Sequence, residues 1–137
     1  MRILVIDGQG GGLGAQLVTR LKNRLGDQAQ IWAVGTNSMA TTSMLKAGAD
    51  RAATGDNAAC YNVLLADVVM GPIGLLCANA LMGKVSPALA AAVSAAPGRR
   101  ILIPMSSCGI LVAGTAGQRM EELLQDAVEL AAKEVKP

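Results

Sequence analysis

The residues best suited to chemistry in this chain are the glycines that follow its first apolar run, in the segment MRILVIDGQGGGLGAQLV. Five of the seven residues from Gly8 to Gly14 are glycine. Glycine supplies the positive φ angles of a strand-to-helix turn and lets an anion approach the backbone without meeting a Cβ atom. The following helix then offers free N–H groups and a partial positive charge. One or two glycines would suffice for a tight turn, so five favour a bound phosphate-bearing ligand.

The spacing of these glycines narrows the choice of ligand class. From Gly10 the pattern is GxGxxA, completed by Gly12 and Ala15. From Gly8 it is GxxxGxG, completed by Gly12 and Gly14. No Gly-Lys-Ser/Thr follows, which excludes a Walker A loop. The GxxxGxG form, over VIDGQGGGLGAQLVTRL, resembles the cofactor loop of short-chain dehydrogenases. This resemblance implies a nicotinamide dinucleotide whose pyrophosphate lies over the loop.

The catalytic residues of short-chain dehydrogenases are not matched in this chain. Their Tyr-x-x-x-Lys pair fails here, because Tyr61 is the single tyrosine and Leu65 stands at the lysine position. Cys108 follows the last predicted strand, but the chain has no histidine to activate it, which favours a structural, half-buried cysteine. Asp7 has two open interpretations: it bonds nearby N–H groups and stabilises the loop, or it contacts the ligand or Mg²⁺. Catalytic residues therefore stay unknown.

The end of the second predicted strand bears on the choice of cofactor. NAD-binding proteins usually place an acid about 20 residues after the glycine loop, on the ribose 2′-OH. Here the sequence reads Gly-Thr-Asn-Ser, and Thr36, Asn37 and Ser38 could instead hold the 2′-phosphate of NADP, with help from Lys46 or Arg51. The alternative is that these side chains cap the next helix. The missing acid also weakens the case for S-adenosylmethionine, as does Gln9 where that cofactor's loop has glycine.

A further loop completes the expected site. Gly71-Pro72-Ile73-Gly74 follows the fourth predicted strand and is expected to pass close to the pyrophosphate or the nicotinamide. No metal site is predicted. The full predicted set for NADP, or NAD, comprises Asp7, Gly8, Gln9, Gly10, Gly11, Gly12, Leu13, Gly14, Thr36, Asn37, Ser38, Gly71, Pro72 and Ile73.

These residues need an alternating scaffold to bring them together. Strand-like segments are predicted at 2–6, 30–35, 51–54, 67–70 and 100–104, with a short sixth at 110–113. Helices are predicted at 13–25, 39–47, from about 56 to 65, 73–82, 87–96 and 118–136. Strands alternating with helices imply parallel pairing. We expect one domain over residues 1–137: a small α/β, doubly wound, Rossmann-like sheet of order 3-2-1-4-5 with helices on both faces. Ligands of such sheets bind where the strand order reverses, which is the place of the glycines.

Composition limits the function classes. The net charge is only +2, and there is one Trp, one Tyr and no Phe, so we expect no nucleic-acid partner. The core must be aliphatic, and Trp32 is expected within it. The segment 63–83 is apolar, but Asp67 and Gly71-Pro72 interrupt it, which argues against a membrane span. Three cysteines without a metal or disulfide spacing, and no signal-peptide pattern, indicate a cytoplasmic protein; Cys60 and Cys77 are expected in the core.

Over nearly its whole length the chain resembles a family of small bacterial Rossmann-like proteins of unknown function. The resemblance rests on IDGQGGGLG, VGTN, LKAGAD, ATGDNA and GPIG, in this order. It implies the fold and the position of the site, and it transfers no catalytic residue.

Two functions from different classes follow. The chain is predicted to be a non-catalytic dinucleotide-binding module, such as a sensor or accessory subunit. The alternative is an NADP-dependent oxidoreductase whose site is shared between subunits. A further alternative is a binder of S-adenosylmethionine or of another nucleotide. A homo-oligomer is expected in either case, because the predicted helices 73–82 and 87–96 are too apolar to be covered easily by a chain this small.

Overall fold

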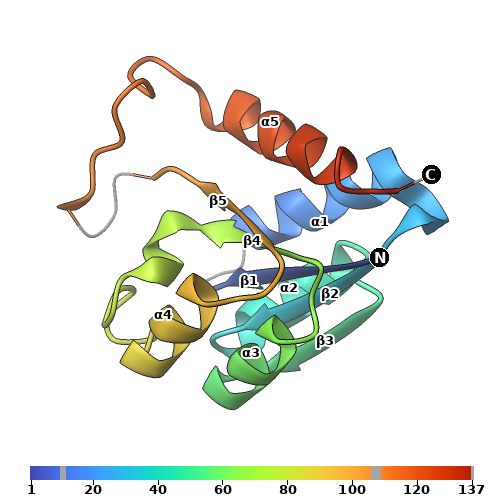
Figure 1. Cartoon of the computed structure of the whole chain (residues 1–137). Coiled ribbons are helices and arrows are strands. Elements are labelled where there is room, and N and C mark those ends of the chain that lie inside the picture. Colours follow the sequence, from blue (N-terminus) through green and yellow to red (C-terminus); the bar gives the residue numbers. More distant parts are fainter. Residues whose placement is uncertain (10–11, 106–108, 137) are drawn as a thin grey trace.

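The computed structural model of the chain describes residues 1–9, 12–105 and 109–136. Within these residues, strands and helices alternate as predicted (Figure 1). The strands are β1 (Arg2–Asp7), β2 (Gln30–Gly35), β3 (Arg51–Thr54), β4 (Val68–Pro72) and β5 (Arg99–Ile103). The α-helices are α1 (Gly12–Leu25), α2 (Ser38–Lys46), α3 (Asp56–Val63), α4 (Pro87–Ser94) and α5 (Met120–Ala132), with short 3-10 turns η1 (Gly26–Gln28) and η2 (Ile73–Leu76).

The described strands form one parallel sheet, and its order β3-β2-β1-β4-β5 confirms the prediction. β1 lies in the middle, with Asp7 opposite Gly35 of β2. The chain moves outward through β2 and β3, then returns to the other side of β1 for β4 and β5. The order therefore reverses beside β1, and the glycine-rich segment begins at its carboxyl end, where ligands of open α/β sheets bind.

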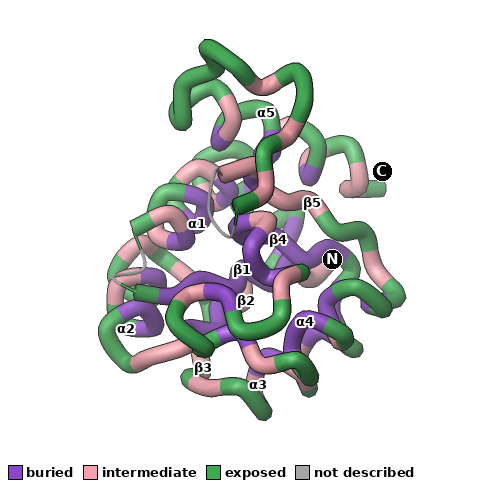
Figure 2. The backbone as a smooth tube through the Cα atoms, turned by 90° about the vertical axis from the view of Figure 1, so that its left-hand side faces the viewer, coloured by how far each residue is buried: buried purple, intermediate pink, exposed green. Residues whose placement is uncertain are grey.

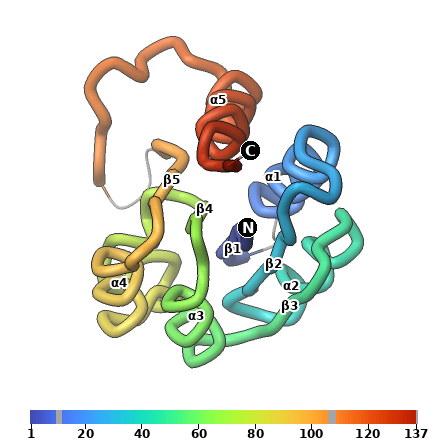
Figure 3. The backbone as a smooth tube through the Cα atoms, turned by 45° about the vertical axis from the view of Figure 1, so that its right-hand side comes forward, coloured from blue at the N-terminus to red at the C-terminus, as the bar shows by residue number. Residues whose placement is uncertain are grey.

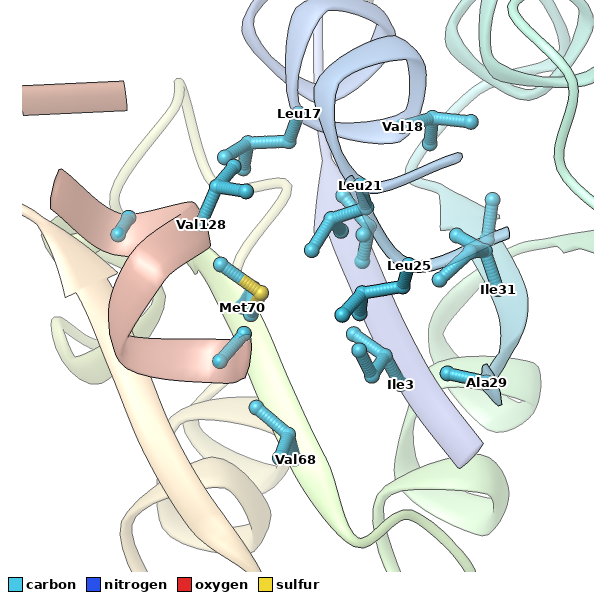
Figure 4. Close-up of a cluster of buried hydrophobic side chains, with 14 of the residues drawn as sticks. Ile3, Leu17, Val18, Leu21, Leu25, Ala29, Ile31, Val68, Met70 and Val128 are labelled. Carbon is cyan, nitrogen blue, oxygen red and sulfur yellow. The ribbon is translucent and has the colours of Figure 1, made fainter. Parts of the chain in front are cut away.

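Two layers of helices cover the sheet, each over its own apolar core (Figures 2 and 3). Alternate residues of β1 serve the two faces: Ile3 and Val5 belong to one core, and Leu4 and Ile6 to the other. Helices α1, α2 and α5 cover the first face, and α3 and α4 the second. Figure 4 shows Leu17 of α1 and Val128 of α5 gathered with Met70 of β4 over the first face. Each fully buried side chain of this kind contributes about 1.5–3 kcal/mol relative to an exposed one.

The ends of several elements have local causes. Gly26 ends α1 with a φ of +54°, as expected for a glycine after a helix. The side-chain oxygen of Ser86 accepts from the N–H of Leu89 at 3.0 Å and so caps α4, whose first residue is Pro87. The predicted boundaries differ from the observed ones by a few residues, and most for α5, which is predicted at 118–136.

The predicted helix at 73–82 is wrong. After η2 the chain turns back on itself, and Asn79, Leu81 and Met82 have positive φ angles of 67°, 56° and 58°. The N–H of Asn79 donates to the carbonyl of Val85 at 2.6 Å, which closes residues 79–85 into a compact loop. This 79–85 loop buries Ala80 and Val85 in the second core. An apolar run without helical periodicity cannot by itself distinguish this arrangement from a buried helix.

Two further expectations are corrected. Residues 110–113 form no strand, so β5 ends the sheet on its side within the described residues. Trp32 is half-buried at the margin of the second core rather than within it, and the guanidinium of Arg2 lies over its ring, 3.7 Å from the ring centroid. Among the described residues, no helix has both the length and the apolar character needed to cross a membrane.

Candidate functional site

Asp7, the last residue of β1, joins the two ends of the glycine-rich segment. Its side chain is buried, with 6% exposed. Its Oδ1 accepts from the N–H of Gly8 at 2.8 Å, and its Oδ2 accepts from the N–H of Gly14 at 2.6 Å. Burial raises the pKa of Asp7 above its ordinary value, although both hydrogen bonds act to lower it. Of the two interpretations of Asp7, the one in which it bonds nearby N–H groups is confirmed.

The carboxylate of Asp7 already binds one of the N–H groups with which α1 could bind an anion. The N–H of Gly14 lies in the first turn of the helix, where free N–H groups would face an anionic ligand. Asp7 already binds it, so within the described part of the chain the other N–H groups of this first turn are those of Gly12 and Leu13. Gly12 is exposed, and a Cβ atom built on it would meet nothing within 4 Å. The open approach to α1 is therefore over Gly12.

Gly14 serves packing rather than ligand access. A Cβ atom at Gly14 would lie 2.6 Å from the sulfur of Met44 and 2.8 Å from the Cβ of Asp7. Helix α1 thus approaches β1 and α2 more closely than any larger residue permits. Gly14, one of the glycines predicted to contact the ligand, is therefore explained by the packing of α1 against β1 and α2.

The residues after β2 are connected to the glycine-rich segment. The N–H of Thr36 donates to the carbonyl of Asp7 at 2.9 Å. The side-chain amide of Asn37 donates to the carbonyl of Gln9 at 2.9 Å, and its oxygen accepts from the N–H of Ala40 at 2.8 Å. Asn37 is therefore the N-cap of α2, which supports the capping alternative for this segment. Ser38 is exposed at the first position of α2.

Lys46 and Arg51 do not belong to this site. Helix α2 runs back across the sheet, so Lys46, its last residue, lies toward the amino edge. Arg51 is the first residue of β3, at that same edge, and its guanidinium lies 5.6 Å from the centroid of Trp32. The expectation that either side chain supports a phosphate beside Thr36 is wrong, because helices and strands of an α/β unit run in opposite directions.

Gly71 and Pro72 lie within β4 rather than in a loop after it, and both are buried. A Cβ atom at Gly71 would collide with the carbonyl oxygen of Ile6 and lie 2.6 Å from Leu75. Gly71 therefore permits the close approach of β4 to β1. Of the predicted residues from this segment, Ile73 is half-buried and lies past the strand end.

Leu81 is a neighbour of the site that no sequence motif indicated. A Cβ atom at Gly8 would lie 2.8 Å from Oγ1 of Thr36 and 3.0 Å from a methyl carbon of Leu81. The Oγ1 atom of Thr36 is buried and has no hydrogen-bond partner among the described residues. Gly8 is thus enclosed between Thr36 and Leu81. Only the return of the 79–85 loop, more than 70 positions along the chain, creates this contact.

Gly10, Gly11 and Cys108 lie outside the described residues. Cys60 and Cys77 are half-buried at the margin of the second core. Burial, with a smaller contribution from Asp56, raises the pKa of the Cys60 thiol.

The fold, with the glycine-rich segment at the carboxyl edge of its sheet, defines a small Rossmann-like α/β protein. The chain belongs to the family described as "Domain of unknown function (DUF3842)", whose pattern matches residues 2–136. The resemblance to a family of unknown function is therefore confirmed, whereas the resemblance of the loop to short-chain dehydrogenases finds no support. A comparison with curated proteins finds no match.

Among solved structures, the chain is similar to a protein described as a dodecameric FMN-dependent UbiX-like decarboxylase from Escherichia coli O157:H7. The identity is 13%, the TM-score is 0.47, and the similarity covers 98% of this chain and 93% of the other. The cofactor in that description is FMN, whereas the sequence predicted NADP or NAD. The nicotinamide prediction is contradicted by this finding.

Proposed function

We propose that this chain is a binding module for a small phosphate-bearing ligand of the nucleotide class, held at the carboxyl edge of the sheet with its phosphate over Gly12 and Leu13. The observation that carries this proposal is the exposed N-terminus of α1 at the point where the strand order reverses. Helix N-termini at this position of α/β sheets bind anions through free N–H groups and the helix dipole.

The hydrogen bonds around the loop support a preformed site. Asp7 bonds both ends of the glycine-rich segment, and Asn37 bonds the carbonyl of Gln9 between them. The described ends of the segment, held in this way, lose little conformational freedom when a ligand binds, which favours affinity. Gln9, Thr36, Ser38 and Ile73 lie on the segments that flank this position, where the rest of the ligand would lie.

Asp7 also limits how the phosphate can be placed. An ionised Asp7 and a phosphate repel one another, so the phosphate should contact the N–H groups of Gly12 and Leu13 and stay away from Gly14. A binding role is favoured over acid–base catalysis, because both oxygens of Asp7 already accept main-chain hydrogen bonds. Such a carboxylate is suited to holding a loop.

Calorimetric titration with matched pairs tests the proposal. Adenosine 5′-monophosphate is compared with adenosine, and FMN with riboflavin, so that each pair differs only in the phosphate. At least one phosphorylated compound should bind at least about tenfold more tightly than its partner, as expected for charge-assisted hydrogen bonds. Equal affinities within both pairs, or no binding of any of the four, would overturn the proposal.

A matched pair of variants locates the site. Gly12→Val places a side chain in open space, so it should leave the fold intact and weaken the phosphorylated compound at least several-fold. Gln16→Val makes an equally β-branched change on the exposed face of α1, one turn further along, and should leave binding unchanged. Mass spectrometry of compounds released from the purified, denatured protein adds an independent readout of any ligand retained from the cell.

A further inference from the structure

A small cavity lies on the second face of the sheet, away from the proposed site. It has a volume of about 170 Å³. It lies between β1, β2, β3 and α3, and its lining includes Leu4, Trp32, Val34, Arg51, Ala53 and Asn62. An engineered cavity of about 150 Å³ with apolar walls is large enough for benzene, so this one can hold a short aliphatic chain or a single ring.

The charges beside this cavity are not balanced. The guanidinium groups of Arg2 and Arg51 lie 3.7 Å and 5.6 Å from the centroid of the Trp32 ring. Neither forms an ion pair within the described part of the chain, and the buried Nε of Arg2 has no hydrogen-bond partner there. Two unpaired cations this close to an apolar cavity favour an anionic occupant.

The nearby acids are engaged elsewhere. Asp50, which precedes Arg51, accepts from Nζ of Lys22 at 2.9 Å and from the N–H of Ile31 at 2.7 Å. Asp67 accepts from the main-chain N–H of Arg2 at 2.8 Å, and no ion pair with the Arg2 guanidinium is found. The positive charge of Arg51 at the wall of the cavity therefore stays available to a ligand.

We propose that this cavity is a second binding site, specific for a small monocarboxylate with an apolar body. The apolar part lies against Leu4, Val34 and Ala53, and the carboxylate binds the guanidinium of Arg51. Arginine suits this role because its planar fork binds a carboxylate through two parallel hydrogen bonds while its face stacks on an aromatic ring. Half-buried Asn62 adds a polar group to the wall.

Trp32 provides the experiment, because it is the single tryptophan and lines the cavity. Its fluorescence in the full chain is followed during titration with pentanoate and, separately, with pentanamide, which has nearly the same shape and no charge. Pentanoate should give a saturable change, and pentanamide should bind at least about tenfold more weakly. No saturable change with pentanoate, or equal affinities for both compounds, overturns the proposal.

Variants separate the charge from the cavity. Arg51→Gln removes the cation from an exposed residue and should weaken pentanoate at least about fivefold, as expected for loss of a charged hydrogen bond. Lys46→Gln removes an equal charge from α2, on the other face, and should leave binding unchanged. Ala53→Leu fills the cavity and should abolish binding in a chain whose circular-dichroism melt shows that it is folded. If Arg51→Gln binds pentanoate as tightly as the unmodified chain, the proposal fails, whatever the behaviour of Ala53→Leu.

Discussion

The carboxylate of Asp7 binds the main-chain N–H of Gly14 at 2.6 Å, and the Cα of Gly14 approaches Asp7 so closely that a Cβ atom there would lie 2.8 Å from the Cβ of Asp7. The hydrogen bond and the close packing depend on one another. A side chain at position 14 would push α1 away from β1 and lengthen the bond. This pair therefore determines how the first helix is seated on the sheet, and with it the position of the open N–H groups over Gly12.

Two glycines of the same helix should respond oppositely to alanine. Gly14→Ala forces a Cβ against Met44 and Asp7, and should lower the free energy of unfolding by about 1–3 kcal/mol, as overpacking does. Gly12→Ala meets open space at the start of α1, and should be neutral or stabilising by up to about 1 kcal/mol, because alanine restricts the unfolded chain. Urea denaturation of both variants measures the difference. Equal destabilisation would show that the packing at Gly14 is not the cause.

Asp7 should make stability depend on pH in the acid range. Its pKa is raised in the folded chain, so the folded state keeps this proton at pH values where the unfolded state has lost it. The contribution of Asp7 to the free energy of unfolding is then greatest at pH values below its ordinary pKa of 3.8. It falls as the pH rises through the pKa of the folded state, and levels off above it.

The variant Asp7→Asn isolates this effect, because asparagine does not titrate. It should be less stable than the unmodified chain by about 1–3 kcal/mol, since one of the two N–H groups loses its acceptor. The difference between the two proteins should shrink as the pH rises above 3.8. Urea denaturation at a series of pH values provides the comparison, and a difference that grows with pH would contradict the direction of the pKa shift.

Two exposed methionines should respond oppositely to glycine. Met82 has a φ of +58° and is 97% exposed, so Met82→Gly removes backbone strain without removing packing, and should stabilise the chain by about 1 kcal/mol. Met39 is 68% exposed within α2, where glycine should cost about 1 kcal/mol. The melting temperature should rise for Met82→Gly and fall for Met39→Gly. A lower melting temperature for Met82→Gly would mean that its side chain stabilises the loop.

The homo-oligomer stays a prediction, on changed grounds. The apolar segments that motivated it are largely covered by their own sheet, with Leu75, Leu89 and Val93 buried in the second core. Apolar side chains do remain exposed at 97% for Met82 and 86% for Leu111, both on segments that follow the carboxyl ends of strands. An exposed apolar patch that includes both side chains would favour an interface.

Light scattering decides this question. At micromolar concentration the mass should exceed the 13.9 kDa of one chain. The double variant Met82→Ser, Leu111→Ser should lower it, whereas Leu64→Ser, an exposed leucine that lies after α3, should not. A mass of one chain for the unmodified protein would refute self-association.

The sequence by itself was sufficient for the scaffold. Strands of β-branched and aliphatic residues, amphipathic helices such as α1 and α5, and stop signals such as Gly26 are local features, and local features also set the alternation that implies a parallel sheet. The strand order followed from the Rossmann-like arrangement expected for that alternation. The place of the glycine-rich segment followed in turn, because the order reverses beside the first strand.

The tertiary structure alone decided which groups meet at the site. Asp7 bonds Gly14 only because α1 packs tightly on β1, and Leu81 reaches Gly8 only because the 79–85 loop folds back where a helix was predicted. Arg51 and Lys46 were expected beside the end of the second strand, yet the opposite directions of helix and strand carry them to the other edge. Contacts between residues far apart in sequence depend on how closely the elements pack, to within a few tenths of an ångström. The spacing of residues along the chain does not determine that packing.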